Sequence, residues 1–379
     1  MSSDFERKAQ QAIELTLVPG IGELFRRRLL GACREISGLF SMDIPGLTRV
    51  GIPLASAEAL ATRRYRPMSE EILDWCLKEG CRLLVSGDAG YPAMLQEIHD
   101  APSVLYARGN ISCLDCSCLA LVGTRRPTPY GLQMAEGLAS DLAHRGITII
   151  SGLARGIDAA AHRGCLSANG RTVAVLGCGI DVVYPREHGH LTRRILEQGL
   201  LLSEFPPGTS PAPQNFPVRN RIISGLSLGV LIVEASEYSG SLITARLALE
   251  QNREVYAVPG NVTSPHSFGP NYLIKQGAKL VQSWRDIVEE FPAEERREIL
   301  AKEAQSGTRT QARLDLLSEE EKRVLGLLET DSATQFDRIL AASGGGVSQL
   351  SDMLFNLEMK GWVRQLPGSL YVRLIRPGE

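Results

Sequence analysis

Six short apolar runs alternate with amphipathic helical stretches through the middle of the chain, and this alternation constrains the fold more than any other sequence feature. The apolar runs are Cys118–Val122, Ile147–Ile150, Thr172–Leu176, Gly199–Leu202, Gly229–Val233 and Glu254–Val258. The helical stretches between most of them are Tyr130–His144, Ile157–Ala168, His188–Gln198 and Ser241–Gln251. Strands that are apolar along their whole length and alternate with helices are typical of a parallel sheet covered on both faces. The sequence therefore predicts a Rossmann-like, doubly wound α/β domain over residues 71–290.

The segments on either side of this domain are predicted to be mostly helical. Residues 1–70 show short helical stretches on both sides of a turn at Pro19–Gly22, which predicts a small all-helical domain. Residues 291–313 are charged and then rich in Ser, Gly and Thr, which indicates a helix end and a linker. In residues 314–379 a capping box at Ser318–Glu321 begins the first of three helical stretches, and a hairpin-like pair of strands follows. This order predicts a winged-helix domain.

The composition indicates a globular protein in which any anion site is local. Of the 379 residues, 44% are hydrophobic and 22% are charged, and the net charge is −2. The polar first residues predict no secretory signal, and the lack of any run of about 18 apolar residues predicts no membrane span. We therefore expect a cytoplasmic protein. A chain without net positive charge binds anions through a few arginines and backbone amides brought to one place.

Three of the eight cysteines form a CxxCxC segment, Cys113, Cys116 and Cys118. A tetrahedral metal site needs a fourth ligand close in space, and the sequence has no second CxxC pair. We therefore expect reduced thiols, no metal and no cofactor.

Four loops rich in glycine, serine and arginine stand out near the predicted strands and helices. They are residues 123–126, 151–158, 215–221 and 239–244. In an open parallel sheet, the loops at the carboxyl ends of the strands meet at one edge, where helix N-termini point free amides outward. Small residues there let the backbone approach an anion, and Arg125, Arg126 and Arg155 supply positive charge. The sequence therefore predicts an extended anion-binding groove.

The residues of the groove favour single-stranded nucleic acid over a nucleotide. The chain has no P-loop sequence, and the Gly177–Gly179 pair begins a dinucleotide fingerprint whose third glycine position holds Val182. By contrast, Phe216 lies close in sequence to Arg219 and Arg221. Aromatic faces stack the bases of a flexible strand while neighbouring arginines hold its phosphates.

Several of these residues also have a purely structural interpretation. Phe216 is suited to fill the core beneath its loop. Arg219 and Arg221 have carboxylates available as partners, namely Glu204 and Glu234. These alternatives remain open from the sequence alone.

Other polar residues are interpreted as structural. Asp158 and His162 lie four residues apart on one predicted helix, and they more readily cap and brace that helix than form a site. Tyr184-Pro185 is typical of packing and turn elements, and Arg26–Arg28 is typical of a solvated helix face.

The motifs of the central domain resemble one known family. The series GTRRPTPYG, SGLARGIDAAAH, GCGIDVVYP, SEFPPG, FPVRNRIISGLS, EASEYSGSLITARLALEQNREVYAVPG and NYLIKQGA closely resembles the DprA/Smf family of DNA-processing proteins over roughly residues 88–290. The resemblance implies a protein that binds single-stranded DNA and loads the recombinase RecA onto it during natural transformation. It also implies a homodimer formed through the Rossmann domain and no established catalytic activity.

The pattern and the resemblance together name the expected DNA-binding residues. They are Gly123, Arg125, Arg126, Ser151, Gly152, Arg155, Phe216, Arg219, Asn220, Arg221, Gly240 and Ser241. Several relatives carry a lysine close to the phenylalanine motif, where this chain has Pro213, Gln214 and Val218. Part of the basic surface is therefore expected to be weaker or displaced.

The flanks resemble the extra domains of some family members. The Leu17–Gly22 segment is similar to a helix-hairpin-helix or SAM-like fold, with Arg26–Arg28 behind it as a possible DNA contact. The C-terminal block is similar to the family's winged helix. Its predicted recognition helix shows Ser348, Gln349, Asp352 and Asn356, with little basic charge. Because phosphate contacts dominate duplex affinity, a partner-binding or regulatory role is favoured for this block.

Two other classes of function compete with DNA binding. One is an enzyme acting on a nucleotide, for which Glu234, Glu237 and Glu250 are the available carboxylates, without a convincing acid/base pair. The other is a scaffold whose groove is vestigial and whose flanking domains bind proteins. Binding of a labelled oligonucleotide and release of free base from nucleotides discriminate among the three.

Overall fold

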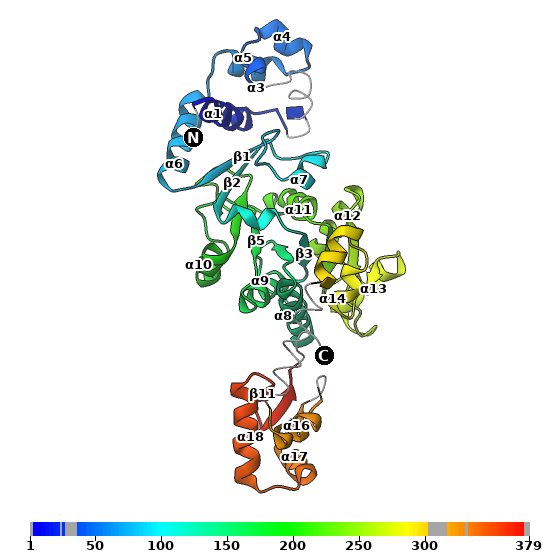
Figure 1. Ribbon diagram of the computed structural model, residues 1–379. Coiled ribbons are helices and arrows are strands. Elements are labelled where there is room, and N and C mark those ends of the chain that lie inside the picture. The colour runs from blue at the N-terminus through cyan, green and yellow to red at the C-terminus, as the bar shows by residue number, and fades with distance from the viewer. Residues whose placement is uncertain (1–2, 23–24, 27–35, 302–316, 330–332, 375–379) are drawn as a thin grey trace. The chain divides into compact units, whose positions relative to one another are not determined.

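The computed structural model describes residues 3–22, 25–26, 36–301, 317–329 and 333–374 (Figure 1). These residues form two compact units, Met1–Pro292 and Ala293–Glu379. No helix among them has the length and apolar character needed to cross a bilayer.

The first unit is built around a sheet that, among the described residues, has nine strands in the order β1-β2-β6-β5-β4-β3-β7-β8-β9. In this spatial order, the seven neighbouring strands that begin with β6 and end with β9 are parallel to one another. They are β3 (Cys118–Val122), β4 (Thr148–Ser151), β5 (Thr172–Leu176), β6 (Leu200–Ser203), β7 (Gly229–Ile232), β8 (Glu254–Ala257) and β9 (Lys279–Leu280). The sequence order reverses between β3 and β7, which confirms a doubly wound, Rossmann-like sheet.

Two antiparallel strands, β1 (Arg82–Val85) and β2 (Val104–Gly109), extend this sheet beyond β6. These two strands were not predicted from the sequence. They are joined by a long connection that carries helix α7 (Ala93–Glu97), so neither a short hairpin turn nor a crossover helix marks them as strands.

Helices cover both faces of the sheet. They are α8 (Pro129–His144), α9 (Ile157–Ser167), α10 (Gly189–Gln198), α11 (Asn215–Gly225), α12 (Gly240–Glu250), α13 (Phe268–Lys275) and α14 (Trp284–Val288). Successive residues of β5 point to opposite faces: Ala174 and Leu176 belong to the core that contains α9 and α10, whereas Val173 and Val175 belong to the core that contains α11 and α12. Burial on both faces explains why these strands are apolar at every position.

The N-terminal helices belong to the same compact unit as the sheet. They are α1 (Ser3–Leu17), α3 (Ile36–Leu39), α4 (Ile44–Arg49), α5 (Leu54–Ala61) and α6 (Arg66–Lys78). Their core, with Ile13 and Leu60, is continuous with Leu83 and Tyr106 of the two antiparallel strands. The domain boundary predicted at residue 70 lies inside α6. Arg26 is buried, in contrast to the solvated face predicted for it, and Arg27 and Arg28 lie outside the described residues.

The second unit contains the predicted three helices and two-stranded wing. After the helical residues 293–301, its described elements are α16 (Glu319–Gly326), β10 (Thr334–Gln335), α17 (Phe336–Ser343), α18 (Val347–Met359), β11 (Val363–Leu366) and β12 (Leu370–Arg373). The capping box is formed as predicted: Glu321 N–H donates to Ser318 Oγ (3.1 Å) and Ser318 N–H donates to Glu321 Oε2 (2.9 Å). The unit encloses its own core, which includes Val324, Leu354 and Trp362.

A candidate nucleic-acid interface at the carboxyl edge of the sheet

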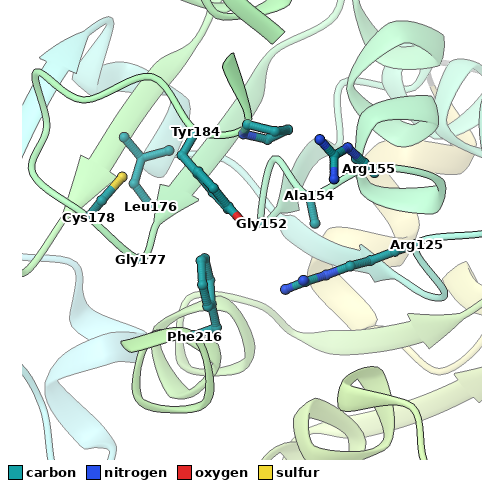
Figure 2. Close-up of a pocket in the computed structure, with 10 residues that line it drawn as sticks. Arg125, Gly152, Ala154, Arg155, Leu176, Gly177, Cys178, Tyr184 and Phe216 are labelled. Carbon is teal, nitrogen blue, oxygen red and sulfur yellow. The ribbon is translucent and has the colours of Figure 1, made fainter. Parts of the chain in front are cut away.

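A small pocket lies where the loops after β3, β4 and β5 meet the start of α11. It is lined by Arg125, Gly152, Ala154, Arg155, Leu176, Gly177, Cys178, Tyr184, Pro185 and Phe216 (Figure 2). Four of the predicted DNA-binding residues, Arg125, Gly152, Arg155 and Phe216, are therefore brought together. Its volume is about 20 Å³, roughly the room that one water needs.

Phe216, in the first turn of α11, is half-buried and forms one wall of the pocket. Its ring packs against the backbone of Gly177, where an added Cβ would lie 2.8 Å from the ring. The ring centroid of Tyr184 lies 5.5 Å away. The ring is therefore neither free in solvent nor sealed in the core, and its position depends on the absence of a side chain at residue 177.

Arg125 is exposed and reaches over the ring of Phe216, with its Cζ 5.3 Å from the ring centroid (Figure 2). Arg126 beside it is exposed as well. Within the part of the chain that the structure describes, neither guanidinium forms an ion pair. Both guanidinium groups are therefore accessible to an external anion. Arg155, by contrast, is exposed but paired with Glu187.

Close packing between loops fixes the backbone that carries Arg125. A Cβ at Gly123 would lie 2.7 Å from the side chain of Ile157, so only glycine fits there. Gly156 has φ +78°, a left-handed conformation that favours glycine. Thr124 N–H donates to Glu234 O (2.7 Å), and Ile157 N–H donates to Thr124 O (3.2 Å). The glycines of these two motifs therefore shape the loops.

Arg219 was expected to line the groove, but the structure buries it beneath the pocket, with 4% of its surface exposed. Its guanidinium donates to the carbonyl of Gly152 (2.7 Å), to the carbonyl of Val175, and to Asn220 Oδ1 (3.1 Å). Burial lowers the pKa of Arg219 to about 10, so it remains a cation at neutral pH. Its role here is to tie the ends of β4 and β5 to α11.

Arg221 is likewise turned away from the groove, with 4% of its surface exposed. It forms ion pairs with Glu204 (2.5 Å) and Asp100 (3.1 Å). The alternative interpretation of Arg221 as a partner of Glu204 is therefore confirmed.

The remaining predicted residues lie beside or behind the pocket. Ser151 is fully buried and its hydroxyl donates to Leu121 O (2.6 Å). Ser239 caps α12, and the hydroxyls of Ser239 and Ser241 lie 2.8 Å apart. Gly240 is exposed, and a Cβ there would meet nothing within 4 Å. Of these residues, only Gly240 presents open backbone to solvent.

The crevice between β3 and β7, where open α/β sheets bind their ligands, is filled by the chain itself. The carboxylate of Glu234 accepts hydrogen bonds from the N–H (2.9 Å) and the hydroxyl (2.5 Å) of Thr128, the residue that caps α8. Gly131 leaves the space that this carboxylate occupies. A protein carboxylate therefore takes the place at the helix N-terminus where a nucleotide phosphate binds in Rossmann enzymes.

Asp158 and His162 brace the fold, as the structural interpretation predicted. Asp158 accepts hydrogen bonds from the N–H groups of Gly152 (3.2 Å) and Ala154 (3.3 Å), and burial raises its pKa. His162 is fully buried and its Nδ1 lies 2.7 Å from Thr172 Oγ1.

Replacing His162 with glutamine is expected to reduce the acid sensitivity of folding. Burial, aided by nearby positive charges, lowers the pKa of His162 to about 3 from the usual 6.5. At pH values between these two pKa values, His162 binds a proton in the unfolded chain but not in the folded protein. The free energy of unfolding therefore decreases as pH falls below about 6.5. For one histidine this loss between pH 7 and pH 5 is about 2 kcal/mol. Urea unfolding at both pH values measures it, and an equal loss in wild type and His162→Gln would contradict the assignment.

Two of the three cysteines in the CxxCxC segment are part of the protein interior. Cys113 and Cys118 are buried, and burial raises the pKa of the first thiol to about 11 and of the second to about 12. Cys116 accepts a hydrogen bond from the Arg171 guanidinium (2.7 Å). Across the described ranges, no cluster of three or more His, Cys, Asp or Glu side chains is arranged to hold a metal.

Tyr184 is the aromatic pocket residue that was not predicted, because its motif was interpreted as a packing element. It is 37% exposed and its ring faces Phe216 at a tilt of 35° (Figure 2). Its sequence signal was its place in the loop after β5, at the same sheet edge as the four loops predicted to form the groove.

The fold and the pocket define a Rossmann-like protein with an arginine–aromatic pocket at one sheet edge and an appended winged helix. The model of the family described as DNA recombination-mediator protein A matches residues 82–292, and that of the DprA winged helix domain matches residues 308–369. The chain belongs to the DprA family of DNA recombination-mediator proteins.

Individual relatives agree with this assignment. The chain is 40% identical to Protein Smf of Escherichia coli over 336 residues, covering 88% of each chain. It is 41% identical to the DNA processing protein DprA of Bacillus subtilis over 286 residues, covering 75% of this chain and 96% of that protein.

Two solved structures are similar as well. That of DprA from Streptococcus pneumoniae has a TM-score of 0.66 at 35% identity and covers 74% of this chain and 96% of that one. A DprA structure from Helicobacter pylori, described for its single-stranded DNA binding mode, has a TM-score of 0.50 at 32% identity and covers 54% of this chain and 94% of that one.

Proposed function

We propose that this protein binds single-stranded DNA along the carboxyl edge of its sheet and delivers it to the recombinase RecA during natural transformation. The observation that carries the proposal is the exposed Arg125 guanidinium held over the half-buried ring of Phe216. Arg125 and Arg126 bind phosphates, the open backbone at Gly240 receives another, and Phe216 receives a base. The DNA-binding relative from Helicobacter pylori supports the choice of ligand.

The protein acts by binding rather than by catalysis. Two of the three carboxylates considered for an acid/base role have other partners: Glu234 accepts hydrogen bonds from Thr128, and Glu250 pairs with Arg246 (3.0 Å). Glu237 is exposed and does not line the pocket.

Membership of the DprA family and an exposed apolar surface on α13 and β9 support a homodimer formed through the Rossmann domain. On α13 the exposed rings of Phe268 and Tyr272 stack with centroids 6.2 Å apart, and Leu280 of β9 is exposed too. A second copy of the chain is the partner proposed for this surface.

The winged helix serves as a partner-binding module in this proposal. The exposed face of α18 carries Val347, Phe355 and Met359. Apolar side chains on a recognition helix suit a protein surface better than a phosphate backbone.

The test is the binding of labelled oligo-dT and of a matched hairpin duplex, followed by fluorescence anisotropy. Single strands are expected to bind more tightly, with a log–log salt slope of about −0.7 for each phosphate neutralised. Arg126→Ala should weaken binding and make the slope shallower by about that amount. Arg163→Ala on α9, where Arg163 pairs with Glu136, is the matched control and should not change the slope. Equal affinity for both DNA forms would refute the proposal.

A further inference from the structure

We propose that Tyr184 and Phe216 form a two-ring clamp that closes on one unpaired base, with Tyr184 as the wall that opens. This inference rests on the proposed function and names a base contact in the same site. The two rings come from different segments, the loop after β5 and the first turn of α11, and they face one another across the pocket (Figure 2).

The clamp is closed in the free protein. The ring centroids are 5.5 Å apart, whereas a base stacked between two rings needs about 7 Å, two contact distances of about 3.5 Å each. One wall must therefore move before a base enters.

Phe216 is the fixed wall. Its ring lies directly against the Gly177 backbone, so it cannot retreat in that direction. The helix that carries it is held by buried Arg219, bonded to the carbonyls of Gly152 and Val175, and by Arg221, paired with Glu204. Moving this ring away would require shifting α11 against the sheet.

Tyr184 is the wall with room to move. Its side chain is 37% exposed, while the chain on its C-terminal side is anchored: His188 Nδ1 lies 3.0 Å from Leu153 O, and Glu187 pairs with Arg155. A rotation of the Tyr184 side chain opens the gap without loss of these contacts. As the base enters, Arg125 leaves the face of Phe216 and turns to the adjacent phosphate, a stronger partner than the ring.

A clamp of this kind distinguishes single strands from duplex. A base can lie between two rings only when it is unpaired and turned out of its stack, and a duplex base must first be unpaired at a cost of a few kcal/mol. The clamp accepts any base, because every base has a flat aromatic face.

The experiment measures binding of oligo-dT, and of the same oligomer with abasic sites, to the full-length Tyr184→Leu and Tyr184→Phe proteins. Leucine is expected to lower oligo-dT affinity about tenfold, and phenylalanine, which keeps the ring, by less than about twofold. Neither substitution should change the affinity for the abasic oligomer. In a Phe216→Ala background Tyr184→Leu should still weaken binding, because Tyr184 contacts the base directly. No further loss there would mean that Tyr184 only supports Phe216 and would overturn the clamp.

A second variant keeps the proposal testable if Tyr184→Leu fails to fold. The Tyr184→Trp protein has one indole more than the wild type, which has three tryptophans. The additional fluorescence of this variant, relative to wild type, should be quenched by oligo-dT and unchanged by the abasic oligomer. Absence of quenching in a protein that binds oligo-dT overturns the clamp and leaves the proposed function standing. A wild-type protein that binds no oligonucleotide overturns both.

Discussion

Replacing both Arg125 and Phe216 with alanine should lower the affinity for oligo-dT by about 100-fold or more. Loss of a stacked aromatic ring costs about 1–3 kcal/mol per base, and loss of a charge-assisted phosphate contact costs about 1.5–3 kcal/mol. Each single variant is therefore expected to lose about 30-fold, which corresponds to about 2 kcal/mol. Anisotropy titrations with the four proteins of the double-mutant cycle measure the effect.

The cycle also tests whether the two side chains act together. Because the Arg125 guanidinium lies 5.3 Å from the ring centroid of Phe216, removal of the ring should also release the arginine from its position. The binding free energies lost in the two single variants should then add up to more than the loss in the double variant. We expect this difference, the coupling energy, to be about 0.5 kcal/mol or more. Arg163→Ala serves again as the surface control. Wild-type affinity in the double variant would exclude this pocket as the DNA site.

Arg219→Met should lower the free energy of unfolding by about 3 kcal/mol or more, the usual cost of removing one partner from a buried charge arrangement. The change leaves the carbonyls of Gly152 and Val175 without this donor and removes the positive charge near buried Asp158. The midpoint of urea unfolding measures the loss. Arg126→Ala, which alters an exposed arginine of the same groove, should change stability by less than about 0.5 kcal/mol.

The DNA-binding behaviour of the Arg219 variant separates a positioning role from a direct contact. If Arg219 acts only by holding α11, then Arg219→Met weakens binding without changing the salt slope. If it contacts a phosphate, the slope becomes shallower by about 0.7. An Arg219→Met protein that is as stable as wild type and binds DNA with a shallower salt slope would contradict the burial of Arg219.

Much of the fold was predictable because its signals are local. The strands from Cys118–Val122 to Glu254–Ala257 and the helices α8, α9, α10 and α12 lie within one or two residues of the predicted ranges. Helix α11 differs, because it begins at Asn215, where a loop was predicted. The capping box at Ser318 marked the start of the winged helix for the same reason. Strands β1 and β2 were not predicted, because a long connection separates them and no turn motif marks their antiparallel pairing. Strand β2 also pairs with the edge of β6, a contact that local sequence patterns do not indicate.

The candidate site was predictable in residue type but only partly in role. Arg125, Arg219 and Arg221 look alike in the sequence, and only the first faces solvent. Tyr184 was misinterpreted for the converse reason: its importance comes from Phe216, which lies far along the chain and close in space.

The sequence by itself determined six of the parallel strands, most of the helices between them and the edge at which the loops gather, because these follow from apolar periodicity and from glycine and cap residues near each element. Only the tertiary structure decided which arginines remain available to an anion. Burial and pairing of a guanidinium depend on acceptors from distant segments, here the carbonyls of Gly152 and Val175 and the carboxylates of Asp100 and Glu204. Folding brings those acceptors to Arg219 and Arg221 and leaves Arg125 over an aromatic ring at the surface.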